Sequence, residues 1–285
     1  MENKERSWIF PLLIATSYVL MIVMNALASL LPINGKTTGE VSDSYPNLFA
    51  PPGITFAVWG VIYLLLAGYV VYQFIAFSKN CDATTTFTLI RVGVLFVISS
   101  IFNIAWIVAW HFDFILVSTV LIIALLICLI LIALNFRNKK LTFREKLFVR
   151  LPFSIYFGWI TVAVIANITI LLVDIGWNQF GLPEALWTVL IILVGAAIAS
   201  ATMVFNKDYF YILPVAWAYV GIIFKHIDAD GFNRRYPTVY FAAAIGIAMM
   251  FLAFIYSVIL RKLPKHKEDQ LPESDNSKDP SGEQT

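Results

Sequence analysis

Charged side chains are scarce in this sequence of 285 residues: Asp, Glu, Lys and Arg make up 13% of it, against about 25% in soluble domains. Cysteine occurs twice and histidine three times, which excludes a disulfide framework and leaves no cluster at metal-ligand spacing. The chain is instead 60% hydrophobic, with a mean hydropathy of +0.80. Its apolar runs are too long and too uniform for the alternating strands of a membrane barrel. We therefore predict an all-α integral membrane protein.

The apolar runs predict about eight membrane spans, because roughly 20 residues are needed to cross the hydrocarbon core. The seventh run is the shortest and follows a break of three polar residues, Asn-Lys-Asp. The expected spans are 8–33, 52–78, 88–110, 114–136, 150–174, 184–205, 208–225 and 236–261. Residues 262–285 have no aromatic residue and many charges. We predict that they form a disordered cytoplasmic tail.

Basic residues beside the spans predict the topology. The loop 137–149 is the densest basic segment and is expected in the cytoplasm. Eight spans then place both termini in the cytoplasm and the loop 34–50 outside. The loop 226–235 would also lie outside, although it carries two arginines. We expect a multi-pass protein of a plasma membrane, and the short loops are typical of a bacterial chain.

Several functional features are lacking. The sequence shows no nucleophile beside a base, no Gly-rich phosphate loop and no paired carboxylates within a span. We therefore expect no enzyme activity, no obligatory cofactor, no metal site and no nucleic-acid partner. Neither His226 nor His266 has a metal-site pattern, and His111 is expected in a solvated turn beside Asp113. Trp8, Trp110 and Trp177, at span ends, are expected in the interfacial aromatic belt.

Three spans each carry a stripe of aromatic and small polar residues on one helix face. If the stripes meet, they line a cavity suited to a flat, largely apolar ligand with a few polar edges. The alternative is plain packing, with each Asn bonding only across helices. The stripes are Phe56, Trp59 and Tyr63; Ser99, Asn103 and Trp106; and Trp159, Ala163 and Asn167.

A double proline precedes the second span. Pro51 and Pro52 lack a backbone N–H, so they suit the first turn of a helix, whose leading donors have no intrahelical partner. The loop before them holds Tyr45 near the mouth of that helix. We expect this loop to form a lid over the cavity.

These segments resemble the TspO/MBR family of tryptophan-rich sensory or translocator proteins. The similarity rests on "YPNLFAPPGITFAVWGVIYLLLAG" at 45–68, "FNIAW" at 102–106 and "WITVAVIAN" at 159–167. The resemblance implies a five-helix bundle over 1–174 that binds porphyrins, sterol-like or other flat hydrophobic molecules. Carried over position by position, it implies that Trp59, Tyr63, Asn103, Trp106, Trp159, Ala163 and Asn167 face the ligand beneath Tyr45, Pro51 and Pro52. Departures at Ile54, Ser99 and Pro152 bear on the ligand more than on the fold.

The helices expected over 175–261 are extra to that five-helix bundle. Small residues at four-residue spacing there, such as Gly195 with Ala199 and Ala242 with Gly246, indicate close helix packing within one bundle or across a homodimer. We expect a protein of the lipid bilayer that binds a tetrapyrrole such as a porphyrin or haem, for sensing or transport. An eight-helix secondary transporter and light-dependent porphyrin degradation are the alternatives. Against a proton-coupled carrier, no span carries an Asp, Glu or Lys well inside it.

Overall fold

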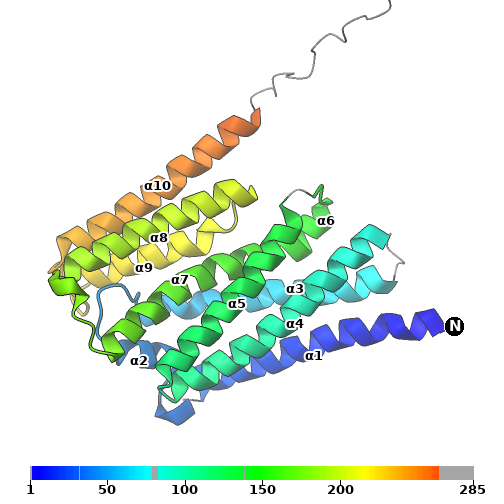
Figure 1. Ribbon diagram of the computed structural model, residues 1–285, viewed down its shortest axis with the longest axis horizontal. Helices are drawn as coiled ribbons and strands as arrows, with labels where there is room; N and C mark the ends of the chain where they lie inside the picture. The colour runs from blue at the N-terminus through cyan, green and yellow to red at the C-terminus, as the bar shows by residue number, and fades with distance from the viewer. Residues whose placement is uncertain (1, 32, 79–82, 138, 263–285) are drawn as a thin grey trace, which may run out of the picture.

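The structure is a computed structural model that describes residues 2–31, 33–78, 83–137 and 139–262. These residues form helices joined by short turns, as Figure 1 shows, so the all-α class is confirmed. The predicted tail and His266 lie outside the described residues. Seven helices are long and apolar enough to cross a membrane within the described ranges.

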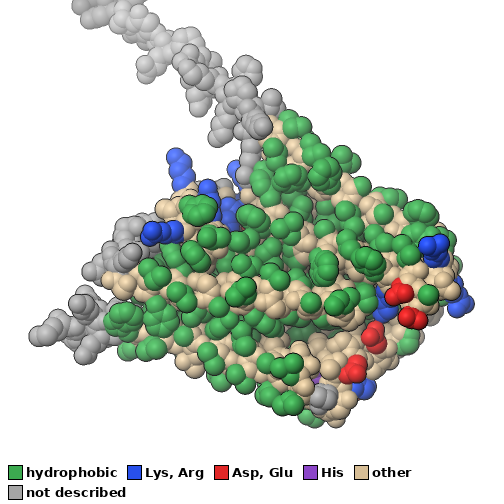
Figure 2. Space-filling model, turned by 180° about the vertical axis from the view of Figure 1, so that it is seen from behind, with side chains coloured by type: hydrophobic (Ala, Val, Ile, Leu, Met, Phe, Trp, Pro, Cys, Tyr) green, Lys and Arg blue, Asp and Glu red, His purple; other side chains and the backbone are tan. Residues whose placement is uncertain are grey.

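Five long helices make the first bundle. Helix α1 packs against α3 and α4, α4 against α5, and α7 against both α5 and α3, which closes the bundle. Hydrophobic side chains cover most of the surface between its ends, and acidic side chains gather at the end that carries α2 (Figures 1 and 2). The helices are α1 (Glu2–Leu30), α3 (Val58–Ser78), α4 (Ala83–His111), α5 (Ile115–Phe136) and α7 (Leu151–Asp174).

The connection from α1 to α3 is structured. It contains η1 (Ile33–Gly35), the short helix α2 (Thr38–Asp43) and η2 (Gly53–Ala57), a turn of 3₁₀-helix. A capping box between Thr37 and Glu40 starts α2. Pro52 precedes η2, and the α-helix itself begins only at Val58. The expectation that the prolines open an α-helix directly was therefore wrong, because a tighter 3₁₀ turn intervenes.

Three further helices lie together on one side of the bundle (Figure 1). Helix α9 packs against α7, and α10 covers α8 and α9. Helix α9 has 16 residues and is not among the seven helices long enough to cross a membrane, so the predicted span 208–225 is not confirmed. The bounds are η4 (Gln179–Gly181), α8 (Glu184–Asn206), α9 (Ile212–Ile227) and α10 (Pro237–Lys262).

The basic loop is shorter than expected. A second capping box, between Thr142 and Glu145, starts α6 (Phe143–Glu145). The π-helical stretch η3 (Lys146–Arg150) then leads into α7 without a break. The expectation of a loop through residue 149 was wrong because this cap begins the helix early.

Small residues of α8 and α10 make room for the ring of Tyr219 on α9. A Cβ added at Gly195 would lie 2.6 Å from the Tyr219 hydroxyl oxygen, and one at Gly246 would lie 2.7 Å from its ring. The Tyr219 hydroxyl donates to the backbone oxygen of Ile192 at 2.6 Å. The predicted close packing is confirmed here within one chain.

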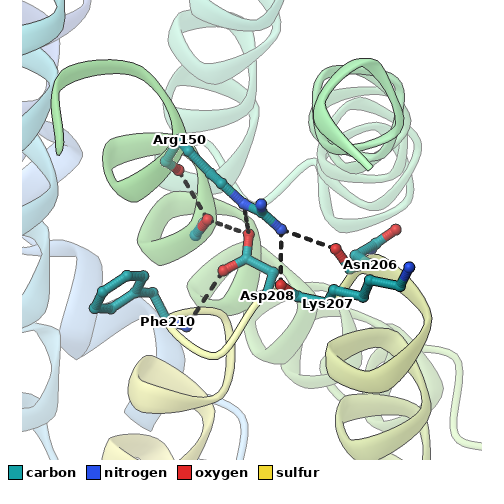
Figure 3. A network of polar contacts seen from close by, with 6 residues as sticks. Arg150, Asn206, Lys207, Asp208 and Phe210 are labelled. Carbon is teal, nitrogen blue, oxygen red and sulfur yellow. Dashed lines mark hydrogen bonds and ion pairs between the residues drawn. The ribbon is translucent and has the colours of Figure 1, made fainter. Parts of the chain in front are cut away.

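A polar network joins the start of α7 to the turn between α8 and α9 (Figure 3). The Arg150 Nε lies 3.3 Å from Asp208 Oδ2, and its Nη2 donates to the backbone oxygens of Asn206 and Lys207 at 2.8 and 2.9 Å. Ser154 also donates to the Asp208 carboxylate. The guanidinium thus binds backbone carbonyls at the negative end of α8, which stabilises the turn between α8 and α9.

Candidate functional site

A cavity of about 340 Å³ lies between α1, α2, α4 and the start of α3. Its wall on the α3 side is aromatic, and its other walls carry small polar groups. The aromatic wall consists of Phe56, Trp59 and Tyr63, and the polar groups belong to Asn25, Ser29, Thr37 and Thr38. The shape and lining are those of a site for a mainly apolar ligand with a few hydrogen-bonding atoms.

Trp59 is the centre of a cluster of rings behind this wall. Its neighbours come from α3, α4 and α7, so the predicted stripes do meet. The Trp59 ring centroid lies 5.5 Å from that of Tyr63, 6.2 Å from Trp106, 6.0 Å from Tyr156 and 6.2 Å from Trp159. Phe56 packs edge-on against Trp159 at 5.9 Å. Trp106 and Trp159 are buried and support the wall from behind, while Trp59 is half-buried beside the cavity.

Asn103 connects the cavity lining to the cluster. Its Oδ1 accepts from Asn25 Nδ2 at 2.6 Å, and its Nδ2 donates to the Tyr156 hydroxyl at 3.2 Å. Asn103 is fully buried, so it fixes Asn25, which lines the cavity, rather than lining the cavity itself.

Asn167 lies deeper and joins three helices. Its Oδ1 accepts from Trp106 Nε1 at 2.9 Å, and its Nδ2 donates to Thr119 Oγ1 at 2.8 Å and Ser118 Oγ at 3.1 Å. These bonds lock the orientation of the Trp106 ring. Ala163, four residues earlier, packs against the core and does not line the cavity.

Helix α2 forms one wall of the cavity and is bonded to the end of α4. The Trp110 Nε1 donates to the backbone oxygen of Thr38 at 3.2 Å, and the Thr38 hydroxyl lies 3.4 Å from His111 Nε2. His111 and Trp110 are 1% and 4% exposed. The expectations of a solvated His111 and an interfacial Trp110 were therefore wrong, because the connection after α1 folds back over the end of α4.

Tyr45, Pro51 and Pro52 lie on the other side of α2. Pro51 packs near Gly221 of α9, and none of the three lines the cavity. The Tyr45 hydroxyl donates to Asp113 Oδ1 at 3.2 Å. Burial, with the charges of Asp113 and Asp174, raises the pKa of Tyr45 to about 12, so the hydroxyl keeps its proton.

The later helices hold the same connection. Lys225 Nζ of α9 lies 3.1 Å from Asp43 Oδ1 at the end of α2. Trp217 Nε1 donates to the backbone oxygen of Thr55 at 2.9 Å. Helix α9 therefore contacts the connection between α1 and α3 at two places, Asp43 and Thr55. A five-helix bundle that ends at residue 174 does not predict these contacts.

Two buried polar atoms in the aromatic cluster have no hydrogen-bond partner: the Tyr63 hydroxyl and Trp159 Nε1. Tyr63 lines the cavity. A buried polar group without a partner costs about 1–3 kcal/mol, and such groups are concentrated where a ligand binds or a water is held. The Tyr63 residue therefore lines the cavity, while its hydroxyl oxygen is buried behind the cavity surface.

Sequence reasoning missed Tyr156 and Asn25. Tyr156 precedes Trp159 by three residues and so falls on the same face of α7, a spacing that could have identified it. Asn25 is the amide-bearing residue of the first span, which carries no aromatic stripe beside it. Its place in the cavity lining and its hydrogen bond to Asn103 show that it belongs to the site.

Comparison with protein families identifies the chain. The model of the family described as TSPO-like protein matches residues 11–256. The chain belongs to the TSPO-like family. Membership and the apolar helices together establish a multi-span membrane protein of this family. The TSPO-like match extends into α10 and so includes the later helices. Comparisons with curated proteins and with solved structures found no match.

Proposed function

We propose that this TSPO-like protein binds a flat, largely apolar molecule, such as a porphyrin or another tetrapyrrole, in the cavity beneath α2. The observation that carries the proposal is the aromatic wall formed by Phe56, Trp59 and Tyr63. Stacking on these rings supplies the apolar contact. Asn25, Ser29 and Thr38 offer hydrogen bonds to polar edges.

The sequence interpretation assigned those polar contacts to Asn103 and Asn167. Both amides bond to other side chains across helices in the structure. We therefore propose that they position Asn25 and Trp106, and that the ligand itself meets Asn25. Trp106 and Trp159 then act by holding Trp59 in place.

Helix α2 is proposed to move when the ligand enters. The cavity volume of about 340 Å³ is near the small end of the usual range for ligand sites, roughly 300–1,000 Å³. A tetrapyrrole thus needs more room than the closed cavity gives. The Lys225–Asp43 ion pair and the contacts of Thr38 are the ones that outward movement of α2 breaks.

Titration of the purified protein with protoporphyrin, followed by Trp fluorescence, tests this proposal. Saturable binding in the micromolar range is expected. The dissociation constant should rise in Trp59→Phe, Trp106→Phe and Asn103→Ala but not in Trp8→Phe, because Trp8 lies on α1 and is 43% exposed. Deletion of residues 36–44 should also weaken binding. Folded protein without saturable binding, or equal affinities in all variants, would contradict the proposal.

Sensing and transport are both compatible with such binding. We propose a binding protein rather than an enzyme, in a plasma membrane, with both termini in the cytoplasm. Figure 2 shows basic side chains at both ends of the molecule and acidic ones gathered at one of them, and the Lys and Arg residues of the segment 137–150 favour this orientation. A homodimer remains a prediction, because the small residues of α8 and α10 are used within the chain.

A further inference from the structure

A second cavity lies where α7 ends and α8 begins, on the far side of the 45–52 segment from the first. Its volume is about 290 Å³. Trp177 and Trp187 form one wall, with ring centroids 4.8 Å apart and planes at 67°. Phe180 packs against Trp177 at 5.2 Å. These aromatic rings come from the two sides of one tight connection.

The polar lining of this cavity carries a negative charge only. Glu184 is the one ionisable residue among the described lining residues, which include no Lys or Arg. Glu184 is the first residue of α8 and is exposed. The other polar lining groups are neutral amides and hydroxyls, those of Asn47, Thr169, Gln179 and Thr188.

The connection that places these rings is conformationally strained. Gln179 and Phe180 have φ values of 57° and 56°, a left-handed conformation that costs non-glycine residues roughly 1–2 kcal/mol each. The side chain of Asn178 accepts from the Phe180 backbone N–H at 3.2 Å and holds the turn. Strained backbone is common at ligand-binding sites, so the strain at Gln179 and Phe180 supports a functional role for this cavity.

We propose that this cavity binds an organic ammonium cation. The faces of Trp177 and Trp187 attract a positive charge through their quadrupoles, and the Glu184 carboxylate supplies the counter-charge. An anion has no positive partner among the lining residues. A metal ion would find a single carboxylate there, fewer oxygen ligands than Ca²⁺ or Mg²⁺ require. The cavity therefore fits an alkylated ammonium group, which needs aromatic faces and one negative charge.

Two sources can supply this chemistry: the choline headgroup of a lipid and a free quaternary ammonium solute. The cavity lies at the helix ends, at the level where headgroups are found. Its lining residues Pro46 and Asn47 belong to the connection between α1 and α3, and they lie between α2 and η2. This proposal does not depend on tetrapyrrole binding. Its test follows Trp177 and Trp187, which do not line the first cavity.

Choline binding to the full-length protein labelled with fluorotryptophan tests the proposal by ¹⁹F NMR at constant ionic strength. The resonances of Trp177 and Trp187 should shift saturably with choline but not with its uncharged isostere, in which carbon replaces nitrogen. Glu184→Gln should raise the dissociation constant about tenfold. The matched control Asp230→Asn, which removes an exposed carboxylate outside the cavity, should leave it unchanged.

Repeating the titration in nanodiscs identifies the source. If phosphatidylcholine already shifts both resonances relative to phosphatidylglycerol, and choline adds nothing, the occupant is the lipid headgroup. If only added choline shifts them, the occupant is a free solute. Equal shifts with the isostere, or no effect of Glu184→Gln in a folded variant, would show that Trp177 and Trp187 are only interfacial anchors, and would overturn the proposal.

Discussion

At the scale of single residues, the site depends on amides that hold aromatic rings. Asn167 accepts from Trp106 Nε1 and donates to two hydroxyls of α5. Those hydroxyls also bond to Ile115 of their own helix, so loss of Asn167 leaves the indole N–H as the group without a partner. Asn103 performs the corresponding task for Asn25. Both amides act on the cavity through another side chain.

Asn167→Ala should lower the free energy of unfolding by about 1–2 kcal/mol, because a buried indole N–H loses its acceptor. Unfolding in mixed micelles, followed by Trp fluorescence, measures the change. The control is Asn135→Ala, whose exposed amide bonds only to Leu131 of its own helix and should be nearly neutral. Equal effects of the two substitutions would contradict the role of Asn167.

At the scale of elements, α2 is a short helix whose position depends on caps and on contacts at both ends. A helix of 6 residues is not stable alone in water. It is held by its capping box, by Thr38 with Trp110 and His111, and by the Asp43–Lys225 pair. Val41, which is fully buried in the hydrophobic core, adds an apolar contact to these polar ones.

The capping box predicts a pH dependence of α2. Hydrogen bonds from the Thr37 backbone and side chain lower the pKa of Glu40. A lowered pKa in the folded state means that this stabilisation is present above the ordinary carboxyl pKa and is lost as the pH falls through the lowered value. A spin label at Ser44→Cys, with Cys81 and Cys128 replaced by Ser, should therefore become more mobile in acid. In a background with Asp43→Asn, which removes the ion pair with Lys225, Glu40→Gln should abolish the change in mobility with pH; the same acid response there would contradict the argument.

At the scale of the whole molecule, the later helices pack directly on the first five. Gly158 of α7 lies so close to the start of α9 that an added Cβ would be 2.1 Å from the Tyr211 backbone oxygen. Tyr211 also donates to Thr161 at 2.9 Å. Arg150 and Asp208 join the two parts at one end, and Lys225 and Asp43 at the other. The start of α9 is therefore packed tightly on α7.

Gly158→Ala should destabilise the protein by about 1–3 kcal/mol, because backbone must move to admit the methyl group. The free energy of unfolding in bicelles, measured by steric trapping, is the readout. Gly60→Ala is the matched control: no atom lies within 4 Å of its added Cβ, and alanine favours a helix. A neutral Gly158→Ala would show that α9 packs more loosely on α7 than described.

The sequence predicts the helices better than the connections between them. Long apolar runs and aromatic stripes at helical spacing identify the spans, and the structure brings the rings of Phe56, Trp59, Tyr63, Trp106 and Trp159 together. The burial of His111 and the contacts of α9 with residues 43 and 55 depend on pairs more than 70 residues apart. No local pattern encodes such pairs. The division of the chain into parts at residue 174 stays a prediction.

Protection of a cysteine in the cavity tests the central claim most directly. Ser29→Cys, in protein without Cys81 and Cys128, lies in the cavity lining, whereas Ser78→Cys lies exposed at the far end of α3. Saturating protoporphyrin should slow the reaction of Ser29→Cys with a maleimide several-fold and leave that of Ser78→Cys unchanged. Bound protoporphyrin with no protection of Ser29→Cys would contradict the account, because the ligand would then occupy another part of the molecule.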